Sequence, residues 1–271
     1  MDYSDFEYLD IDVRDHIAFI TLNGPERGNT WGATGHREMS NVLRRIQVDD
    51  DVRVVVITGS GRAFAVGATT ERFTEITSGD PLVAYRAMTE VREMVYSAID
   101  CDVPVITAVN GPINGSALTF ALMTDLIIVE RQVTIRDAHV LGSLTAGDGG
   151  VLTWPLAMGL VRTKRFLFTG DPLTAEEAER LGLITEVVDT GTSLARATEL
   201  AARLAAAPQM ALRTTKRALN QWLRAGAVTA FDVSVAFEQF TQILPETQAT
   251  LVGLASAERN KDAAPAAEAP A

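Results

Sequence analysis

The chain has 271 residues and 47% of them are hydrophobic, which is enough to bury a sizeable core and excludes global disorder. Its formal net charge of −11 argues against nucleic acid or an anionic membrane as a general partner, because a negative surface repels phosphate. The single cysteine, Cys101, excludes a disulfide framework, and the three histidines argue against a multi-histidine metal centre. The N-terminus has no apolar signal stretch and no run approaches the ~18 apolar residues of a membrane span, so we expect a cytoplasmic protein.

Strand and helix patterns alternate over the first two thirds of the chain, which predicts an α/β core over residues 1–192. Alternating β-branched residues predict a strand over 11–22. Nearly continuous apolar runs predict strands that are buried on both faces, over 52–58, 103–109 and 126–130, and a short strand follows over 184–188. Apolar residues at helical spacing predict helices over 35–48, 80–99, 117–123, 150–158, 163–169 and 174–181.

From Ser193 onward the pattern is helical and rich in Ala and Leu. It predicts three helices, over 193–206, 210–225 and 227–255. Their apolar side chains exceed what a small cap needs, so we expect the helical region 193–256 to contact a neighbouring subunit. The tail over 257–271 ends in APAAEAPA, a low-complexity composition typical of disorder.

Two glycine-rich junctions between a strand and a helix are the first candidates for chemistry. One is the stretch from Gly59 to Ala68 and the other runs from Asn110 to Ser116. Glycine lets backbone N–H groups approach a ligand oxygen, so the two junctions could each supply one donor to an oxyanion. The alternative is two ordinary turns. Neither stretch matches a nucleotide phosphate loop.

Four side chains could complete a site. His139 is suited to general base work, and Asp148, nine residues later in a glycine-rich turn, could orient its imidazole. Trp31 lies in a glycine-rich segment that is a poor place for a core tryptophan, and Glu238 lies in an apolar helical run. Each has a plainer interpretation: a structural histidine, a surface or interface tryptophan, and a glutamate on the solvent-exposed stripe of its helix.

Taken together, these stretches resemble the crotonase (enoyl-CoA hydratase/isomerase) superfamily over about residues 10–255. The stretches that carry the resemblance are VRVVVITGSGRAFAVGA, VPVITAVNGPINGSALTFALMTDLIIV, GDGG and FLFTGDPLTAEEAERLGLITEVV. The resemblance implies a ClpP/crotonase-like fold of repeated ββα units, with C-terminal helices at the contacts of a homotrimer or a dimer of trimers. It also implies an enolate held by the backbone N–H groups of Ala68 and Ser116.

The sequence departs from the hydratases of this family at the positions that handle water. Their two glutamates fall here on Thr119 and His139, and the aspartate that usually follows the first oxyanion residue is Thr69. Neither a threonine nor a histidine reproduces a pair of carboxylates. We therefore expect that replacing Thr119 by alanine would cost little activity.

The pattern is similar instead to the β-diketone hydrolase branch, typified by 6-oxocamphor hydrolase. That branch carries a histidine, an aspartate nine residues later in a GDG turn, a Trp-Pro pair, an early tryptophan and a late glutamate. The matching residues here are His139, Asp148, Trp154-Pro155, Trp31 and Glu238. One departure is Ser116, which stands where the branch has a second histidine.

Three interpretations follow. The first is hydrolysis of the C–C bond of a β-diketone by a retro-Claisen route, with water activated by His139 and Asp148, assistance from Glu238, and no metal or redox cofactor. The second is an enoyl-CoA hydratase or isomerase that uses His139 and Asp148 in place of glutamates, with a coenzyme A thioester as substrate. No basic cluster is clearly placed for the phosphates of that thioester, and Arg62 and Arg72 are candidates. The third is a non-catalytic member of the fold. For the first we expect a nitrogen of His139 within hydrogen-bond reach of Asp148.

Overall fold

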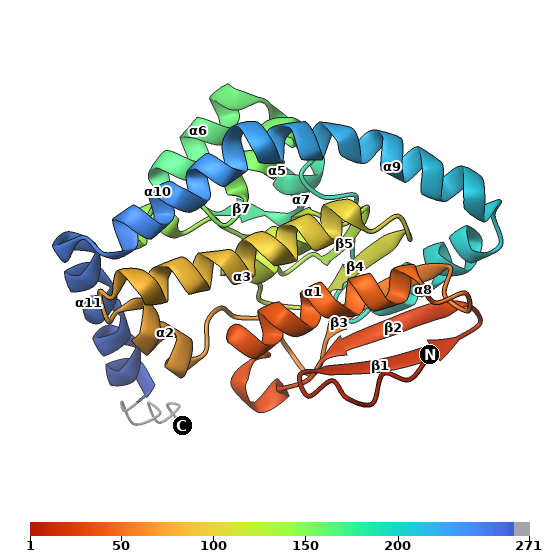
Figure 1. The fold of residues 1–271 in the computed structure, drawn as a ribbon, viewed down its shortest axis with the longest axis horizontal. Helices are drawn as coiled ribbons and strands as arrows, with labels where there is room; N and C mark the ends of the chain where they lie inside the picture. The colour runs from red at the N-terminus through yellow and green to blue at the C-terminus, as the bar shows by residue number, and fades with distance from the viewer. Residues whose placement is uncertain (263–271) are drawn as a thin grey trace, which may run out of the picture.

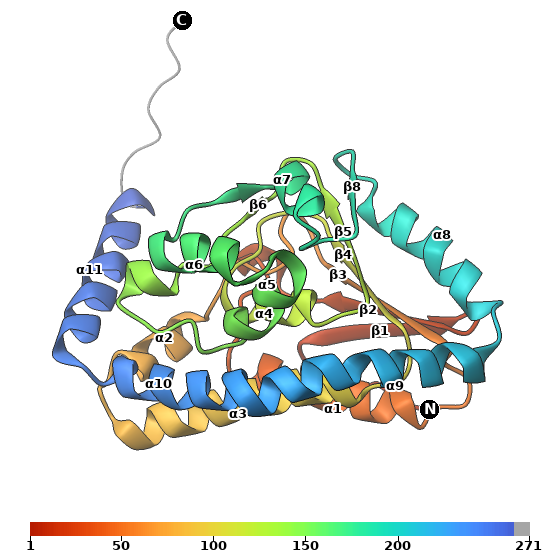
Figure 2. The same cartoon turned by 90° about the horizontal axis from the view of Figure 1, so that it is seen from above.

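The structure is a computed structural model that describes residues 1–262. Its centre is a six-stranded sheet in the order β1-β2-β3-β4-β5-β8, of which Figure 1 labels β1 to β5 and Figure 2 also labels β8. β2 (Ile17–Leu22), β3 (Val54–Gly59), β4 (Val105–Val109), β5 (Leu126–Glu130) and β8 (Glu186–Val188) are parallel, and β1 (Leu9–Arg14) pairs antiparallel with β2 at the edge. The expected α/β architecture is therefore confirmed.

The single strand expected over 11–22 is instead a hairpin. Asp15 and His16 lie between β1 and β2 with φ of 51° and 63°. Positive φ at both central residues is the geometry of a type I′ turn, whose twist matches that of the paired strands. The alternation of β-branched residues continues through this turn, which is why one strand was predicted.

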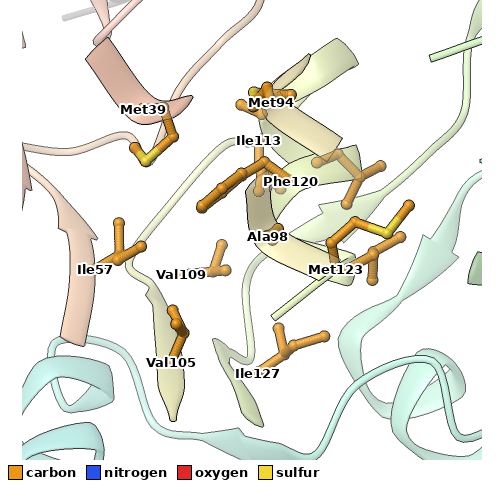
Figure 3. Close-up of a cluster of buried hydrophobic side chains, with 14 of the residues drawn as sticks. Met39, Ile57, Met94, Ala98, Val105, Val109, Ile113, Phe120, Met123 and Ile127 are labelled. Carbon is orange, nitrogen blue, oxygen red and sulfur yellow. The ribbon is translucent and has the colours of Figure 1, made fainter. Parts of the chain in front are cut away.

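Helices cover one face of the sheet with the main hydrophobic core. α1 (Ala33–Gln47) and α3 (Pro81–Asp100) lie over the strands, with α4 (Gly115–Leu122) beside them. Figure 3 shows Met39, Met94 and Phe120 of these helices above Ile57 and Val109 of the sheet. In β4 the pleat directs Val105 and Val109 into this core, while Ile106 and Ala108 face the other way.

The opposite face of the sheet is covered by α8 (Ser193–Ala205). Its Ala197, Ala201 and Ala205 repeat every four residues and pack against apolar residues of β2 to β5, among them Val56 and Ile106. Small side chains let the helix approach the sheet closely. Because α8 belongs to the layers of the sheet, residue 193 begins the helical part of the chain but does not separate it from the core.

The expected gap between the helices over 210–225 and 227–255 is absent, and the second of these helices is instead broken once, before Pro245. α9 (Gln209–Gly226) passes through a π-helical turn (Ala227–Phe231) into α10 (Asp232–Gln242), and α11 (Pro245–Asp262) begins at a proline, which disfavours helix in the residue before it. In Figure 2, α9 and α10 run beside α3. Residues 257–262 of the tail expected to be disordered are helical, and 263–271 lie outside the described residues.

The remaining elements lie between β3 and α8. They are α2 (Thr70–Ile76), which was not predicted, and β6 (Thr134–Ile135), α5 (Gly150–Met158), α6 (Leu160–Thr169), β7 (Leu173–Thr174) and α7 (Ala175–Arg180). Thr174 caps α7, since its hydroxyl accepts from the N–H of Glu177, as its capping pattern predicts. Within residues 1–262, no helix is both long enough and apolar enough to cross a membrane.

Candidate active site

His139 is oriented by Asp137, two residues earlier. Its Nδ1 lies 2.7 Å from Oδ1 of Asp137, and the same oxygen accepts the backbone N–H of His139 at 3.2 Å. A short polar side chain readily bonds the main chain two residues later, which holds the carboxylate beside the ring. Sequence reasoning missed Asp137 in this role, although its spacing from His139 was visible.

The other ring nitrogen faces two carboxylates. Nε2 of His139 lies 3.6 Å from Oδ2 of Asp148 and 3.9 Å from Oε2 of Glu238. The structure therefore brings together all three residues expected to be catalytic, but the hydrogen bond expected between His139 and Asp148 is not formed. The expectation was wrong because the ring already bonds Asp137 through its other nitrogen, and the glycine-rich turn leaves Asp148 just beyond bonding distance.

Asp148 and Glu238 each accept a side-chain hydrogen bond at one oxygen. The hydroxyl of Thr119 donates to Oδ1 of Asp148 at 2.8 Å, and the amide of Gln242 donates to Oε1 of Glu238 at 3.1 Å. Oε2 of Glu238 has no hydrogen-bond partner within residues 1–262. Since a buried polar atom normally has a partner, this oxygen is arranged to meet a ligand or water.

Glycines in the turn around Asp148 permit this close arrangement. A Cβ at position 147 would lie 2.5 Å from Cβ of Glu238, and one at position 149 would lie 2.6 Å from Cγ2 of Thr119. Gly149 also has φ of 133°, which side-chain-bearing residues rarely adopt. The GDGG sequence thus lets α4 and α10 approach the turn from two sides.

Burial and charge set the protonation of this cluster. Burial alone would lower the pKa of His139, but the charges of Asp148 and Asp137 outweigh it and hold that pKa well above its usual range. Burial raises the pKa of Glu238 to about 7, and it also raises the pKa of Asp148. For Asp137, burial would raise the pKa, but the charge of His139 outweighs it and lowers that pKa. These directions favour a protonated imidazole near neutral pH, and the pKa of about 7 makes Glu238 a candidate for proton exchange.

The two predicted oxyanion residues lie on loops that are bonded to each other. Ala65 and Ile113 form a parallel bridge, and the N–H of Asn114 donates to the carbonyl of Ala65 at 3.0 Å. Ser116 lies in the first turn of α4, where backbone N–H groups have no carbonyl partner within the helix.

Trp31 holds the loop that carries Ala68. The N–H of Trp31 donates to the carbonyl of Gly67 at 2.7 Å, and its carbonyl accepts from Thr69 at 3.0 Å. Because backbone groups alternate along an extended strand, the N–H of Ala68 points away from Trp31. The indole is 1% exposed, and its Nε1 has no hydrogen-bond partner among the described residues. Trp31 is therefore buried within the chain, and neither of the two plainer interpretations, a surface or an interface tryptophan, holds.

A cleft of about 410 Å³ opens beside this segment, with Tyr8, Gly32 and Thr69 among its lining residues. The charged residues that line this cleft do not favour a polyphosphate. Its guanidinium groups are those of Arg27 and Arg72, and it also holds three glutamates, Glu7, Glu71 and Glu75.

Neither arginine expected to bind coenzyme A phosphates is well placed for that role. Arg72 is buried and already bonds Glu75, Glu90 and a backbone carbonyl. Arg62 is exposed on the loop after β3 and does not line the cleft.

The cluster is also compatible with a small cation. Asp137, His139 and Asp148 each offer one ligand atom, and these atoms lie within 4.8 Å of one another. However, Nδ1 of His139 already bonds Asp137 and one oxygen of Asp148 already bonds Thr119. A proton on the imidazole supplies the positive charge that the carboxylates need, so the donor set fits water as well as it fits a cation.

Comparisons with known proteins agree with this fold. The sequence profile described as "Enoyl-CoA hydratase/isomerase" matches residues 12–261. "Probable enoyl-CoA hydratase echA12" of Mycobacterium leprae is 35% identical over 76% of this chain and 72% of its own length. The "1,2-epoxyphenylacetyl-CoA isomerase" of Escherichia coli is 31% identical over 79% of this chain and 82% of its own.

Two solved structures are similar at 30% sequence identity. An enoyl-CoA hydratase/isomerase from Mycobacterium paratuberculosis superimposes with a TM-score of 0.87 over 92% of this chain and 99% of its own. ABDH, a β-diketone hydrolase from Anabaena sp. PCC 7120 bound to (S)-3-oxocyclohexyl acetic acid, superimposes with a TM-score of 0.81 over 89% and 96%.

Proposed function

Because this chain belongs to the enoyl-CoA hydratase/isomerase family, the crotonase superfamily, we propose that it hydrolyses the C–C bond between the two carbonyls of a β-diketone. The observation that carries the proposal is the convergence of Nε2 of His139, Oδ2 of Asp148 and the unpartnered Oε2 of Glu238. A water molecule between these atoms would accept a hydrogen bond from His139 and donate one to each carboxylate.

The first half of the reaction activates that water. The carboxylate of Glu238 takes a proton from it, which the pKa of about 7 allows near neutral pH. The hydroxide adds to one carbonyl carbon, and the positive charge of His139 stabilises the negative charge that develops. Asp137 keeps the imidazolium in position throughout. The sequence predicted His139 as the proton acceptor. In this mechanism the acceptor is instead Glu238, which lies beside His139.

The second half breaks the carbon skeleton. The bond between the attacked carbon and the central carbon cleaves, giving a carboxylic acid and an enolate of the remaining ketone. The backbone N–H groups of Ala68 and Ser116 hold the enolate oxygen, and Glu238 returns its proton to the enolate carbon. The indole N–H of Trp31, which lacks an acceptor within residues 1–262, is assigned to substrate binding. Water is the only co-reactant, so we propose no metal or redox cofactor.

The alternative, an acyl-CoA hydratase or isomerase, is favoured by the names of the curated relatives. One observation argues against it here: Arg72, a candidate for the coenzyme A phosphates, is buried and already bonds Glu75 and Glu90. The family's two glutamates are also absent from positions 119 and 139.

The test is a direct comparison of the two substrate classes. The protein is incubated in ¹⁸O-labelled water with pentane-2,4-dione and with cyclic 1,3-diketones, and products are identified by mass spectrometry. We expect a carboxylic acid carrying one labelled oxygen, formed at least about 10²-fold more slowly with Glu238→Gln. Hydration of crotonyl-CoA, or tight calorimetric binding of butyryl-CoA, without diketone cleavage would establish the alternative.

A further inference from the structure

His36 links α1 to the start of α4. It is 4% exposed, and its Nε2 lies 2.8 Å from Oγ of Ser116 while its Nδ1 lies 2.8 Å from the carbonyl of Gly32. The contact with Ser116 was not expected from the sequence, because the two residues are 80 positions apart. The family resemblance gave no role to His36.

The hydrogen positions in this chain of bonds follow from its ends. The Gly32 carbonyl can only accept, so Nδ1 of His36 carries the hydrogen. Burial and the nearby charge of Arg72 lower the pKa of His36 to about 4, so at neutral pH Nε2 has a free lone pair. The hydroxyl of Ser116 therefore donates to Nε2 and cannot donate to a ligand.

The same short segment, 31–36, also holds the other oxyanion loop. The backbone of Trp31 bonds Gly67 and Thr69 on either side of Ala68, as described above. The indole of Trp31 meets the His36 ring edge-on, with ring centroids 5.7 Å apart. One end of the segment thus fixes Ala68 by its backbone, and the other end reaches Ser116 by a side chain.

From this juxtaposition we infer that His36 is a positioning residue, which acts through the Ser116 hydroxyl to set the separation of the two backbone N–H donors at Ala68 and Ser116. The inference rests on the proposed oxyanion function. His36 does not touch the reacting atoms. This role of His36 also explains why a serine can stand where the β-diketone hydrolase branch has a histidine. The hydroxyl of Ser116 bonds His36 of α1 and does not donate to substrate.

Two variants of His36 separate its two bonds. In His36→Asn the shorter amide can reach Gly32 as Nδ1 does, but it no longer reaches Ser116. In His36→Gln the longer side chain places an amide oxygen near the Nε2 position, where it can accept from Ser116. Ser116→Ala keeps the backbone N–H and removes the same bond from the other side, so it tests the inference even where a His36 variant folds poorly.

The first readout does not require turnover. Pentane-2,4-dione absorbs at a longer ultraviolet wavelength as its enolate than as its neutral forms, so a difference spectrum reports how strongly the site stabilises the enolate. We expect the wild-type protein to lower the apparent pKa of the bound dione. We expect about a tenfold or greater loss of this enolate stabilisation in His36→Asn and Ser116→Ala, and wild-type behaviour in His36→Gln.

The second readout is kinetic. We expect kcat to fall by about 10²-fold in His36→Asn and in Ser116→Ala with KM little changed, because a misplaced donor weakens the transition state more than substrate binding. The double variant should lose no more than either single variant, since both remove one bond. The pH dependence of kcat should not change in His36→Asn, as His36 remains neutral throughout the working range.

Three results would overturn the inference. One is a wild-type enolate spectrum in both His36→Asn and Ser116→Ala, and another is fully additive losses in the double variant. The third is an acyl adduct on Ser116 in intact-protein mass spectrometry during turnover, which would make Ser116 a nucleophile. A wild-type protein that stabilises the enolate but cleaves no diketone would overturn only the proposed hydrolysis. No enolate signal at all would overturn the oxyanion assignment together with the role of His36.

Discussion

Oδ1 of Asp137 lies 2.7 Å from Nδ1 of His139, and Asp137 is the carboxylate that fixes the orientation of this ring. The arrangement resembles the orienting aspartate of a catalytic triad in its logic, since the far nitrogen of the ring is directed at the place where chemistry occurs. It leaves Asp148 and Glu238 free to share the other side of the ring with a water molecule.

We expect Asp137→Asn to lower kcat by about 10²–10⁴-fold with little change in KM. The amide keeps the size of the side chain but removes a charge that raises the pKa of His139. The expected direction is therefore a lower pKa of His139, which two-dimensional NMR of the imidazole signals would measure. Asp50→Asn, a change at an exposed carboxylate outside the cluster, serves as the control. An unchanged kcat together with an unchanged His139 pKa would remove Asp137 from the site.

The Asp137–His139 contact could not be predicted from the sequence. The similarity to the β-diketone hydrolase branch predicted that His139, Asp148 and Glu238 share one site, and the structure brings the three side chains together. Which carboxylate bonds the ring depends on differences below 1 Å, 2.7 Å against 3.6 Å, and no pattern of residue types encodes such a difference. The protonation state of His139 could not be predicted either, because it depends on the burial of the ring and on the charges of three nearby carboxylates.

The fold was more predictable than the site because its strands and helices carry strong apolar periodicity. The predicted bounds of β5 and α5 match the structure. The predicted bounds are wrong where the pattern of apolar residues does not reveal a change of backbone direction. The two cases are the turn at Asp15-His16 and the helix break before Pro245. His36 had no signal at all, because its partner Ser116 is brought near only by packing of α1 against the α3–α4 layer.

Thr119 is a second test of the site. The sequence suggested that it is dispensable, but its hydroxyl is the hydrogen-bond partner of Oδ1 of Asp148. Thr119→Ala should therefore lower kcat by about tenfold, because a buried carboxylate oxygen loses its donor and Asp148 can move. Thr119→Ser retains the hydroxyl and should restore most of the rate. Equal activity in all three proteins, measured as acid release from a diketone, would return Thr119 to the role of a spacer.

Assembly is the third prediction. Side chains on one face of α9 and α10 remain largely exposed in the single chain, namely Leu219, Trp222, Val233, Phe237 and Phe240. Such a continuous apolar face is typical of a subunit interface. We expect light scattering to give a mass near three or six times the 29.2 kDa of the chain. Trp222→Glu should shift the protein towards monomer, whereas Val48→Glu, at an isolated exposed valine, should not. A monodisperse wild-type monomer would refute the trimer.

Chelation tests the assignment of the buried cluster to water. If a proton on His139 balances the carboxylates, dialysis against EDTA should leave diketone hydrolysis unchanged. Elemental analysis of the purified protein should then find less than one equivalent of divalent metal. Activity that disappears on chelation and returns with Zn²⁺ or Mn²⁺ would instead assign Asp137, His139 and Asp148 as metal ligands.

The last prediction concerns the pH dependence that Glu238 imposes. Burial raises its pKa from 4.5 to about 7, and only the ionised form can accept a proton from water. Diketone hydrolysis should therefore rise with pH through about 7 and then level off. Stability should move in the opposite direction: between about pH 4.5 and 7 the folded state binds more protons at this position than the unfolded chain, so the free energy of unfolding falls as pH rises.

Glu238→Gln imitates the protonated carboxyl and should remove both effects. Its kcat should fall by about 10²–10⁴-fold, and what remains should lack the rise near pH 7. Its thermal unfolding should depend less on pH than that of the wild-type protein across the same interval, because a buried charge no longer forms there. Glu246→Gln, a change outside the buried cluster, controls for the loss of one carboxylate. A glutamine variant that kept the wild-type rise in activity would transfer the role of proton acceptor from Glu238 to Asp148 or His139.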